Sequence, residues 1–498
     1  MSAMLEVARS ALPYAWTLLL FVVNLAVVSR ALTRPNRTPA SRVAWVAVIM
    51  SLPLVGILAY LMLGETNIGR ARFRRLHEAR VALGALPAGG AAPAPALAGE
   101  AASLFALGHS ISGLPVVGGN RIELLGAPTE SPGQPMQDPD AALDVLIDTL
   151  EAARSSIHIA FYIWLTDDTG TRAARAVMAA ARRGVHCRVM VDALGSRDFR
   201  QSPLWREMAE AGVHLLATLD DVSRLRHMVF SRVDLRDHRK LAVIDNRIGF
   251  FGSQNCADPE FRIKARFAPW VDVLLRCEGP MVRQLQYLFL AGWIPETGET
   301  ALADLVASAP APEPAGASVA QVFETGPTTR HNAMSDMFVA CMYAARRELF
   351  ITTPYFVPDE AILRALCAAP RRGVRTTLIL PARCDSWLVA KASYSCYADL
   401  LDCGVQLHEY PLGLLHAKTL TVDGELALVG SANMDRRSLE LNFENNVLVA
   451  DPAVVQAVRA RQQAYLSVSP EVSPEAVHAW SFRRRLLQNA VGMMAPVL

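Results

Sequence analysis

Two long apolar stretches stand near the start of the chain. Residues 11–29 and residues 43–64 contain no charged side chain, and each is long enough to cross the hydrocarbon core of a bilayer, which takes about 20 helical residues. The short connection between them carries four arginines. This pattern predicts a two-helix transmembrane hairpin that holds both of its ends on one side of the membrane.

A cleaved signal peptide is the alternative interpretation of the first stretch. The residues before it are only weakly basic, because Glu6 offsets Arg9, and no small-residue cleavage site follows. We therefore expect two retained helices and a multi-pass membrane protein. Arginines flank the second stretch on both sides, and their distribution favours a cytoplasmic position for the rest of the chain.

The remainder of the chain alternates short β-type runs with helical stretches, and it does so twice. The apolar run 155–164 is matched by 347–357, and the helical stretch 168–183 is matched by 360–369. A nearby Arg-Arg-Gly follows both helical patterns, where glycine suits a helix C-cap, and a strand rich in Val, Ile and Leu comes next. This order predicts an α/β fold of two similar α/β/α lobes related by a pseudo-two-fold axis.

Two Ala/Pro/Gly-rich segments, residues 83–100 and 307–318, predict flexible connections. The C-terminal tail has Arg483–Arg485 beside apolar residues, so it either lies on a membrane surface or docks onto the second lobe. The expected organisation is a membrane hairpin with its juxtamembrane segment (1–82), a flexible tether (83–118), a first lobe (119–304), an inter-lobe linker (305–319), a second lobe (320–470) and a basic amphipathic tail (471–498).

Composition narrows the function classes. The 498 residues include 19% charged residues and carry a formal net charge of +2, which argues against a nucleic-acid coat or a disordered acidic tail. No pair of the eight cysteines has C-x-x-C spacing, which argues against a zinc site. Most of them stand among apolar neighbours, as buried cysteines do in a reducing compartment.

One pattern of polar residues is written twice: His-x-Lys, four residues, Asp, six residues, then Gly-Ser-x-Asn. At ~5% usage each, six fixed positions match by chance about once in 10⁸ starting points, so two copies in one chain are not an accident. The first copy consists of His238, Lys240, Asp245, Gly252, Ser253 and Asn255. The second copy consists of His416, Lys418, Asp423, Gly430, Ser431 and Asn433.

Each copy reads as a β-hairpin. His and Lys stand two residues apart and share one strand face, the Asp stands at the turn, and the returning strand brings Ser and Asn back beside them. The candidate catalytic residues are His238, Lys240, Asp245, His416, Lys418 and Asp423. The two aspartates stand at the turn, which favours a structural role in fixing the hairpin, although a substitution there can still abolish activity.

This set of groups suits a phosphodiester. Ammonium, hydroxyl and carboxamide groups can hold the non-bridging oxygens and stabilise the transition state, which is the work of a metal pair in other enzymes. We therefore expect no metal and no other cofactor. One His can attack phosphorus while the other protonates the leaving oxygen. The candidate phosphate-binding residues are Ser253, Asn255, Ser431 and Asn433.

A nucleophilic imidazole needs a carboxylate to orient its other nitrogen. Asp272 follows the first His by 34 residues and Glu444 follows the second by 28 residues. Their similar spacing makes these two the candidate orienting carboxylates. A structural ion pair is the alternative role for either one.

At this point the residues resemble the phospholipase D superfamily, whose signature is the duplicated HKD motif. Within it, the chain is most similar to bacterial cardiolipin synthases with two N-terminal membrane helices. The supporting phrases are SLPLVGILAYLMLG in the second apolar stretch (Pro53, Gly56, Tyr60 and Gly64), DPEF and WVD after the first motif, and TPYFVPDE and the Asp385-Ser386 pair in the second half. The longer tether and residues 220–236 depart from the family pattern.

The resemblance implies phosphatidyl transfer. One phosphatidylglycerol, with phosphatidylethanolamine as an alternative donor, would form a phosphatidyl-histidine enzyme and release its headgroup, and a second phosphatidylglycerol would then attack to give cardiolipin. The resemblance makes His238 the nucleophile and His416 the general acid. The resemblance also implies a multi-pass protein of the bacterial cytoplasmic (inner) membrane. The substrates would come from the membrane bilayer, without a nucleic-acid partner.

Several alternatives remain open. Water and glycerol compete for the same intermediate, so a phospholipase D-type hydrolase or a membrane-tethered nuclease fits the motif equally well. A nuclease favours an open basic groove with interleaved aromatic residues, and no such stretch stands out. A non-catalytic membrane scaffold predicts damage to one motif, yet all positions are intact.

Five arginines crowd the approach to the first site, and they form either an anionic-headgroup funnel or a solvated basic face. They are Arg224, Arg226, Arg232, Arg236 and Arg239.

Overall fold

In the computed structural model, the described residues are 2–86, 97–126, 141–220, 232, 234–308 and 312–493. They divide into two compact units. The N-terminal unit holds the chain up to Gly69 and the segment that ends at Leu235, and the main unit holds most of the remainder, from Arg70 to Asp220 and from Arg236 onward.

The N-terminal unit consists of three helices, α1 (Ser2–Thr33), α2 (Pro39–Ser51) and α3 (Pro53–Leu63). Within the described residues, one helical stretch, Tyr14–Thr33, is long and apolar enough to cross a membrane. The second predicted transmembrane helix is wrong as a continuous element, because Pro53 divides it. Proline lacks a backbone N–H and disfavours helical backbone at the residue before it, and Leu52 accordingly has φ −134° and ψ 71°.

The two short helices, α2 and α3, fold back on each other and do not form one helix that crosses a membrane. With 13 and 11 residues and a rise of about 1.5 Å per residue, each falls well short of a ~30 Å hydrocarbon core. Their close approach depends on Gly56, since a Cβ there would lie 2.5 Å from the carbonyl oxygen of Val48. A buried carboxylate closes the unit: Glu65 accepts hydrogen bonds from Arg30 at 2.6 Å and from Tyr60 at 3.0 Å.

The main unit begins with α4 (Arg70–Leu83) and α5 (Gly99–Ser112). The prediction of a flexible tether over 83–118 is therefore wrong for its second part. Leu104, Phe105 and Ile111 are buried at helical spacing, and α5 packs against strand β10 and helix α12. Residues 87–96, the most Ala/Pro-rich part of the predicted tether, lie outside the described residues.

The first half of the main unit contains strands, α-helices and one 3₁₀ helix (η1). In chain order they are β1 (Val117–Leu124), α6 (Ala141–Glu151), β2 (Ser156–Phe161), α7 (Asp168–Arg182), β3 (His186–Asp192), α8 (Arg197–Gln201), α9 (Pro203–Glu210), β4 (His214–Thr218), β5 (Arg236–Asp237), β6 (Lys240–Ile244), β7 (Ile248–Gly252), η1 (Arg262–Phe267), β8 (Trp270–Val271), β9 (Leu274–Glu278) and α10 (Met281–Thr297).

The second half follows after η2 (Thr300–Ala303) and α11 (Asp304–Ala307). Its elements are β10 (Ser318–Thr325), α12 (Ala333–Ala344), β11 (Glu348–Thr352), β12 (Phe356–Val357), α13 (Glu360–Arg371), β13 (Arg375–Pro381), α14 (Trp387–Tyr394), α15 (Tyr397–Asp402), β14 (Gln406–Tyr410), β15 (Leu414–Leu415), β16 (Thr419–Val422), β17 (Leu426–Gly430), β18 (Met434–Asp435), α16 (Arg436–Glu440), β19 (Asn442–Ala450) and α17 (Pro452–Ser467). The tail forms α18 (Pro474–His478) and α19 (Phe482–Gly492).

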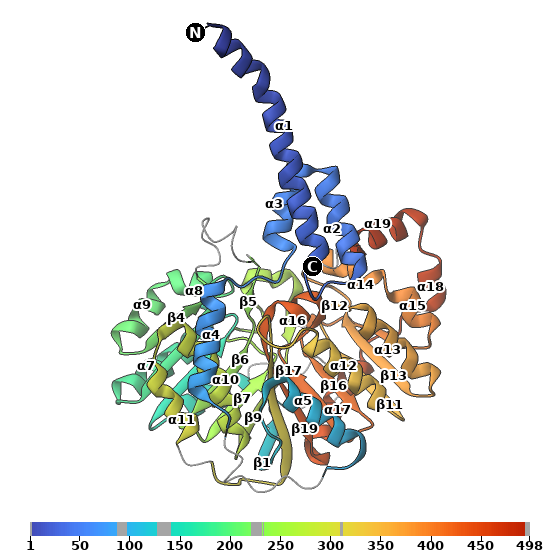
Figure 1. The fold of residues 1–498 in the computed structure, drawn as a ribbon. Coiled ribbons are helices and arrows are strands. Elements are labelled where there is room, and N and C mark those ends of the chain that lie inside the picture. The colour runs from blue at the N-terminus through green and yellow to red at the C-terminus, as the bar shows by residue number, and fades with distance from the viewer. Residues whose placement is uncertain are drawn as a thin grey trace. The chain divides into compact units, whose positions relative to one another are not determined.

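One continuous sheet runs through both halves (Figure 1). Its order is β14-β13-β11-β16-β17-β19-β10 in the second half, followed by β1-β9-β7-β6-β2-β3-β4 in the first half. The prediction of two α/β lobes separated by a linker therefore needs correction, since β1 and β10 pair antiparallel and join the halves into one sheet. In both halves the three outer strands are parallel to each other, and the motif hairpin pairs antiparallel beside them.

Both faces of the sheet are covered, as alternation along the strands requires. In β6, Leu241 and Val243 point into a core shared with α10 and α17, whereas Ala242 and Ile244 point into a core shared with α6 and α7. The second half has the equivalent outer core under α12 and α13. Such two-sided burial explains why the strands read as continuous apolar runs.

The helical turn-back in the N-terminal unit can be tested with Gly56→Leu. The added side chain has no room against the backbone of α2, and forced overpacking of this kind typically costs about 1–3 kcal/mol. We expect a lower midpoint of thermal unfolding for the full chain in detergent. Leu58→Val, at an exposed position of the same helix, is the control and should leave the midpoint unchanged; an equal midpoint for Gly56→Leu would contradict the close approach.

Candidate active site

Each motif folds as the predicted hairpin. The turn between β6 and β7 has positive φ at Asp245 and Asn246, and the turn between β16 and β17 has positive φ at Asp423 and Gly424. Such residues are preferred in tight hairpin turns because they tolerate left-handed backbone. The hairpins carry the histidine and the asparagine of each motif to one cavity.

The motif aspartates do not reach that cavity, which corrects their inclusion among the catalytic candidates. The carboxylate of Asp245 accepts hydrogen bonds from the backbone N–H groups of Arg154, Ser155 and Ser156. The carboxylate of Asp423 accepts the equivalent bonds from Arg346, Arg347 and Glu348. Each aspartate thus clamps its hairpin turn to the start of the neighbouring strand, β2 or β11.

Two short strand pairs connect each motif to the opposite half. β5, which precedes His238, pairs in parallel with β19 of the second half, and the His238 N–H donates to Phe443 O at 2.9 Å. β15, which precedes His416, pairs in parallel with β8 of the first half, and the His416 N–H donates to Val271 O at 2.7 Å. The backbone of each histidine is therefore held by the half that does not contain its motif.

The orienting carboxylates are exchanged in the same way. Nδ1 of His238 lies 2.8 Å from Oε2 of Glu444, and Nδ1 of His416 lies 2.7 Å from Oδ1 of Asp272. Each carboxylate follows one motif in the sequence but bonds the histidine of the other. This arrangement leaves Nε2 of each ring available to a reacting group.

The motif serines support these carboxylates, which corrects their prediction as phosphate-binding residues. Ser253 donates to Asp272 at 2.5 Å, and Ser431 donates to Glu444. Both serines are fully buried. Each carboxylate is thus fixed between the serine of its own half and the histidine of the other half.

The motif asparagines line the cavity. Asn255 accepts a hydrogen bond from the backbone N–H of Ile163 at 3.2 Å, which turns its amide group toward the open space. Asn433 donates to Asp435 at 3.4 Å. Both are placed to contact an oxyanion held between the histidines.

The motif lysines lie directly beneath the histidines. Nζ of Lys240 donates to His238 O at 2.8 Å, and Nζ of Lys418 donates to His416 O at 2.5 Å. Burial lowers the pKa of Lys240 to about 8, against the opposing charges of Glu444 and Asp272. Burial likewise lowers the pKa of Lys418 to about 7, with Asp272 opposing and Lys240 adding to the shift.

Both imidazoles are neutral near pH 7. Burial lowers the pKa of His238 well below its ordinary value, and the neighbouring charges of Lys240 and Lys418 lower it further. Burial lowers the pKa of His416 to about 4, partly offset by Asp272. A neutral ring has the lone pair that a nucleophile or a general base needs.

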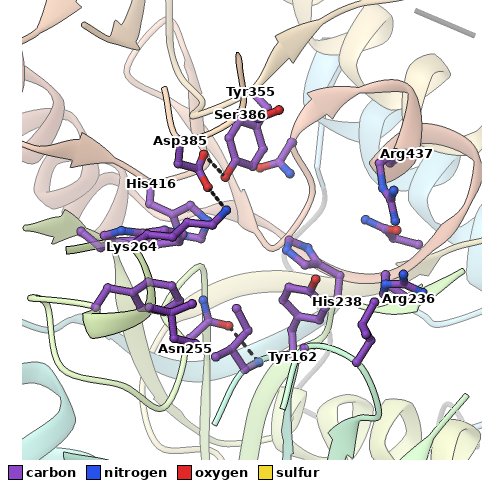
Figure 2. Close-up of a pocket in the computed structure, with 18 of the residues that line it drawn as sticks. Tyr162, Arg236, His238, Asn255, Lys264, Tyr355, Asp385, Ser386, His416 and Arg437 are labelled. Carbon is purple, nitrogen blue, oxygen red and sulfur yellow. Dashed lines mark hydrogen bonds and ion pairs between the residues drawn. The ribbon is translucent and has the colours of Figure 1, made fainter. Parts of the chain in front are cut away.

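The two histidines line one cavity of about 550 Å³. Figure 2 shows His416 with Lys264 and Asp385 on one side and His238 with Arg236 and Arg437 on the other. Tyr355 donates to Asp385 at 2.7 Å and Lys264 forms an ion pair with it. The remaining lining includes apolar side chains such as Leu194, Ile263 and Val389.

Several of these lining residues were not predicted. The ring of Tyr162 packs edge-on against His238 at 4.8 Å between centroids, and the ring of Trp270 lies 4.7 Å from that of His416. The repeated runs that end near a tyrosine gave a signal for Tyr162 and Tyr355. Lys264 and Arg437 had no such signal, because they come from single, unrepeated positions.

Among the described residues, one of the five arginines of the predicted funnel lines the cavity. Arg236 lines the cavity, whereas Arg239 is buried behind the site in an ion pair with Asp237 at 2.7 Å. Arg232 is buried in the N-terminal unit and pairs with Asp234. Arg224 and Arg226 lie outside the described residues.

Comparisons with known proteins show the family of the chain. The family model described as "Cardiolipin synthase, PLD-like domain" matches residues 146–266 and 338–465, and the model described as "Phospholipase_D-nuclease N-terminal" matches residues 19–65. Proteins named cardiolipin synthase A from Salmonella arizonae and Salmonella paratyphi B are each 36% identical over 468 residues, covering 91% of this chain and 92% of theirs.

Among solved structures, phosphatidylserine synthase of Haemophilus influenzae is similar in fold. The TM-score is 0.54 at 12% identity, and the match covers 76% of this chain and 95% of that one. At this identity the likeness concerns the fold alone.

The lowered lysine pKa values predict how anion binding depends on pH. Sulfate keeps its charge above pH 6, so any change in its affinity reflects the protein. As pH rises through about 7 and 8, Lys418 and then Lys240 lose their charge, and we expect sulfate affinity to fall at least tenfold between pH 6.5 and pH 9. Isothermal titration of the detergent-solubilised chain measures this; affinity that stays constant or rises would contradict the assigned charges. Lys391→Met, on α14 outside the cavity lining, is the matched control and should preserve the pH dependence.

Proposed function

Because the chain belongs to the cardiolipin synthase family of phospholipase D-like enzymes, we propose that it transfers a phosphatidyl group between two phosphatidylglycerol molecules and yields cardiolipin and glycerol. The observation that carries this proposal is one cavity lined by two carboxylate-oriented imidazoles, each with a buried lysine bonded to its backbone carbonyl. Phosphatidylethanolamine is a second candidate donor, and nucleic acid has no part in the reaction.

In the first step, Nε2 of His238 attacks the phosphorus of one lipid, and the bond from phosphorus to the headgroup oxygen breaks. The neutral state of His238 suits it to this role, since Lys240, Lys418 and Arg437 all disfavour its protonation. His416 gives a proton to the departing glycerol oxygen. It acquires that proton as the anionic phosphodiester binds beside it and raises its pKa.

In the second step, a hydroxyl of another phosphatidylglycerol enters the place that the glycerol left. His416, now neutral, takes the hydroxyl proton, the oxygen attacks phosphorus, and the bond to Nε2 of His238 breaks. The lysines and Asn255 and Asn433 stabilise the charge on the non-bridging oxygens in both steps. Asp272 and Glu444 keep each ring in the tautomer that exposes Nε2.

The repeated strand order on either side of the antiparallel β1–β10 pair supports a pseudo-two-fold axis that relates the halves. Such symmetry suits a reaction in which two histidines act on one phosphorus atom, one as the nucleophile and the other as the acid and then the base. The apolar helix Tyr14–Thr33 supports attachment to the bacterial inner membrane, where the lipid substrates are.

The activity is tested by reconstituting the full chain in phosphatidylglycerol vesicles and resolving the products by mass spectrometry. We expect cardiolipin and glycerol in equal amounts. His238→Ala should reduce the rate by at least 10³-fold, because the nucleophile is lost, while His478→Ala, at an exposed histidine of α18, should retain full activity. Phosphatidic acid without cardiolipin would instead establish a hydrolase.

The exchanged carboxylates are tested with a lipid that carries a p-nitrophenyl leaving group, which needs no protonation. Glu444→Gln should slow formation of the phosphatidyl-His238 adduct by roughly 10²-fold or more, because it disturbs the nucleophile. Asp272→Asn should leave adduct formation nearly intact and slow its breakdown, because it disturbs only His416. Quenched-flow mass spectrometry measures both steps; the reverse pattern would reverse the roles of the two histidines.

A further inference from the structure

Large apolar side chains are exposed around the mouth of the cavity. Ile263 on η1 and Leu194 after β3 line the cavity and are 54% and 53% exposed. Trp387, at the start of α14, is 55% exposed beside the lining residues Ser386 and Val389. Single exposed apolar residues are ordinary on a protein surface, but a cluster at the entrance of a site marks an interaction surface.

Helix α19 extends this surface. Gln488 and Val491 are buried, and the helix packs against α14, so one side is fixed to the main unit. Phe482 and Leu486 are spaced four residues apart, and Met493 follows seven residues later, which places all three on another face. That face is open, with Phe482 71% exposed and Met493 82% exposed.

The charges that α19 adds to this surface are all positive. Residues 479–493 include three consecutive arginines and no acidic residue, and all three arginines are exposed. η1 repeats the pattern, since Arg262, Lys264 and Arg266 surround Ile263 and are exposed. Basic residues beside exposed apolar residues are typical of segments that lie in the interface of an anionic membrane.

The position of the surface follows from the sheet. Leu194 comes after β3 and Trp387 after β13, so both lie at the carboxyl ends of parallel strands. Helices α8, α14 and α19 lie at this same end of the main unit (Figure 1). Lys264 of η1 reaches Asp385, just before α14, so the two segments are neighbours at the mouth.

We propose that these exposed residues form a docking rim that inserts into the surface of an anionic lipid monolayer and opens the cavity directly toward the lipid. The rim consists of Leu194, Ile263, Trp387, Phe482, Leu486 and Met493. The arginines and Lys264 contact lipid phosphates, while the apolar side chains enter the outer acyl region. A lipid headgroup then reaches the histidines without its acyl chains crossing water.

The position of the rim is tested by a readout that does not depend on turnover, so the result stands apart from the proposed reaction. The full chain is placed in phosphatidylglycerol nanodiscs whose acyl chains carry bromine, and a fluorophore is attached at Leu486→Cys or Ile263→Cys. Tyr343→Cys is the matched control, because Tyr343 is 48% exposed but precedes β11, at the amino ends of the parallel strands. The labelled parent chain gives the background from native cysteines.

We expect bromine to quench the rim labels at least twofold more strongly than the Tyr343 label. Equal quenching would overturn the proposal. A rim label that is shielded from water but not quenched by bromine would also overturn it, because a protein segment or a second copy would then cover the rim.

A kinetic measurement complements the labels. Leu486→Asp should lower the rate with phosphatidylglycerol in bilayers at least tenfold and leave the rate with short-chain, detergent-dispersed phosphatidylglycerol unchanged. Tyr343→Asp should alter neither rate. A Leu486→Asp chain that works equally well on bilayers would contradict the docking role.

Discussion

The active site depends on one exchange: each half of the main unit supplies the histidine that the other half's carboxylate orients. Asp272 holds His416, Glu444 holds His238, and the short pairs β5–β19 and β8–β15 fix the backbone on both sides. Neither half contains a complete site. The antiparallel β1–β10 pair, which makes a single sheet of the two halves, is therefore a requirement of the chemistry as well as of the fold.

Burial gives the site its reactivity. Two lysines, two histidines and two carboxylates lie in one desolvated cluster, and isolating charges from water in this way is unfavourable unless they are paired. The structure offsets the cost in part through the His–carboxylate–Ser chains. The remaining effect of burial lowers the pKa values of the lysines and keeps the imidazoles neutral. A phosphodiester brings the negative charge that favours both ammonium groups, so the cavity binds its substrate class by completing its own charge balance.

The two halves are alike in their motifs but not in what surrounds them. Beside His416 the cavity has an ion pair of Lys264 with Asp385 and the hydroxyl of Tyr355, whereas beside His238 it has Arg236 and Arg437. A symmetrical pair of motifs thus stands in an unsymmetrical cavity. This difference suits a reaction in which one histidine stays neutral and attacks while the other exchanges a proton with the leaving and entering hydroxyl groups.

The sequence alone determined the parts that local physics controls. Apolar β-type runs, Arg-Arg-Gly helix ends and the duplicated motif predicted the α/β elements, both hairpins and the two histidines, because neighbouring residues decide each of them. Tertiary structure decided the pairings. Spacing along the chain assigns Asp272 to the first motif, but β8, the strand directly before it, pairs with β15, which leads into the second motif. The sequence likewise predicted that Ser253 and Ser431 bind phosphate, although in the folded chain both serines donate hydrogen bonds to the carboxylates. The apolar count of residues 43–64 predicted a membrane span, but Pro53 removes the backbone hydrogen bond that a continuous helix needs, and the close packing that Gly56 permits turns the chain back.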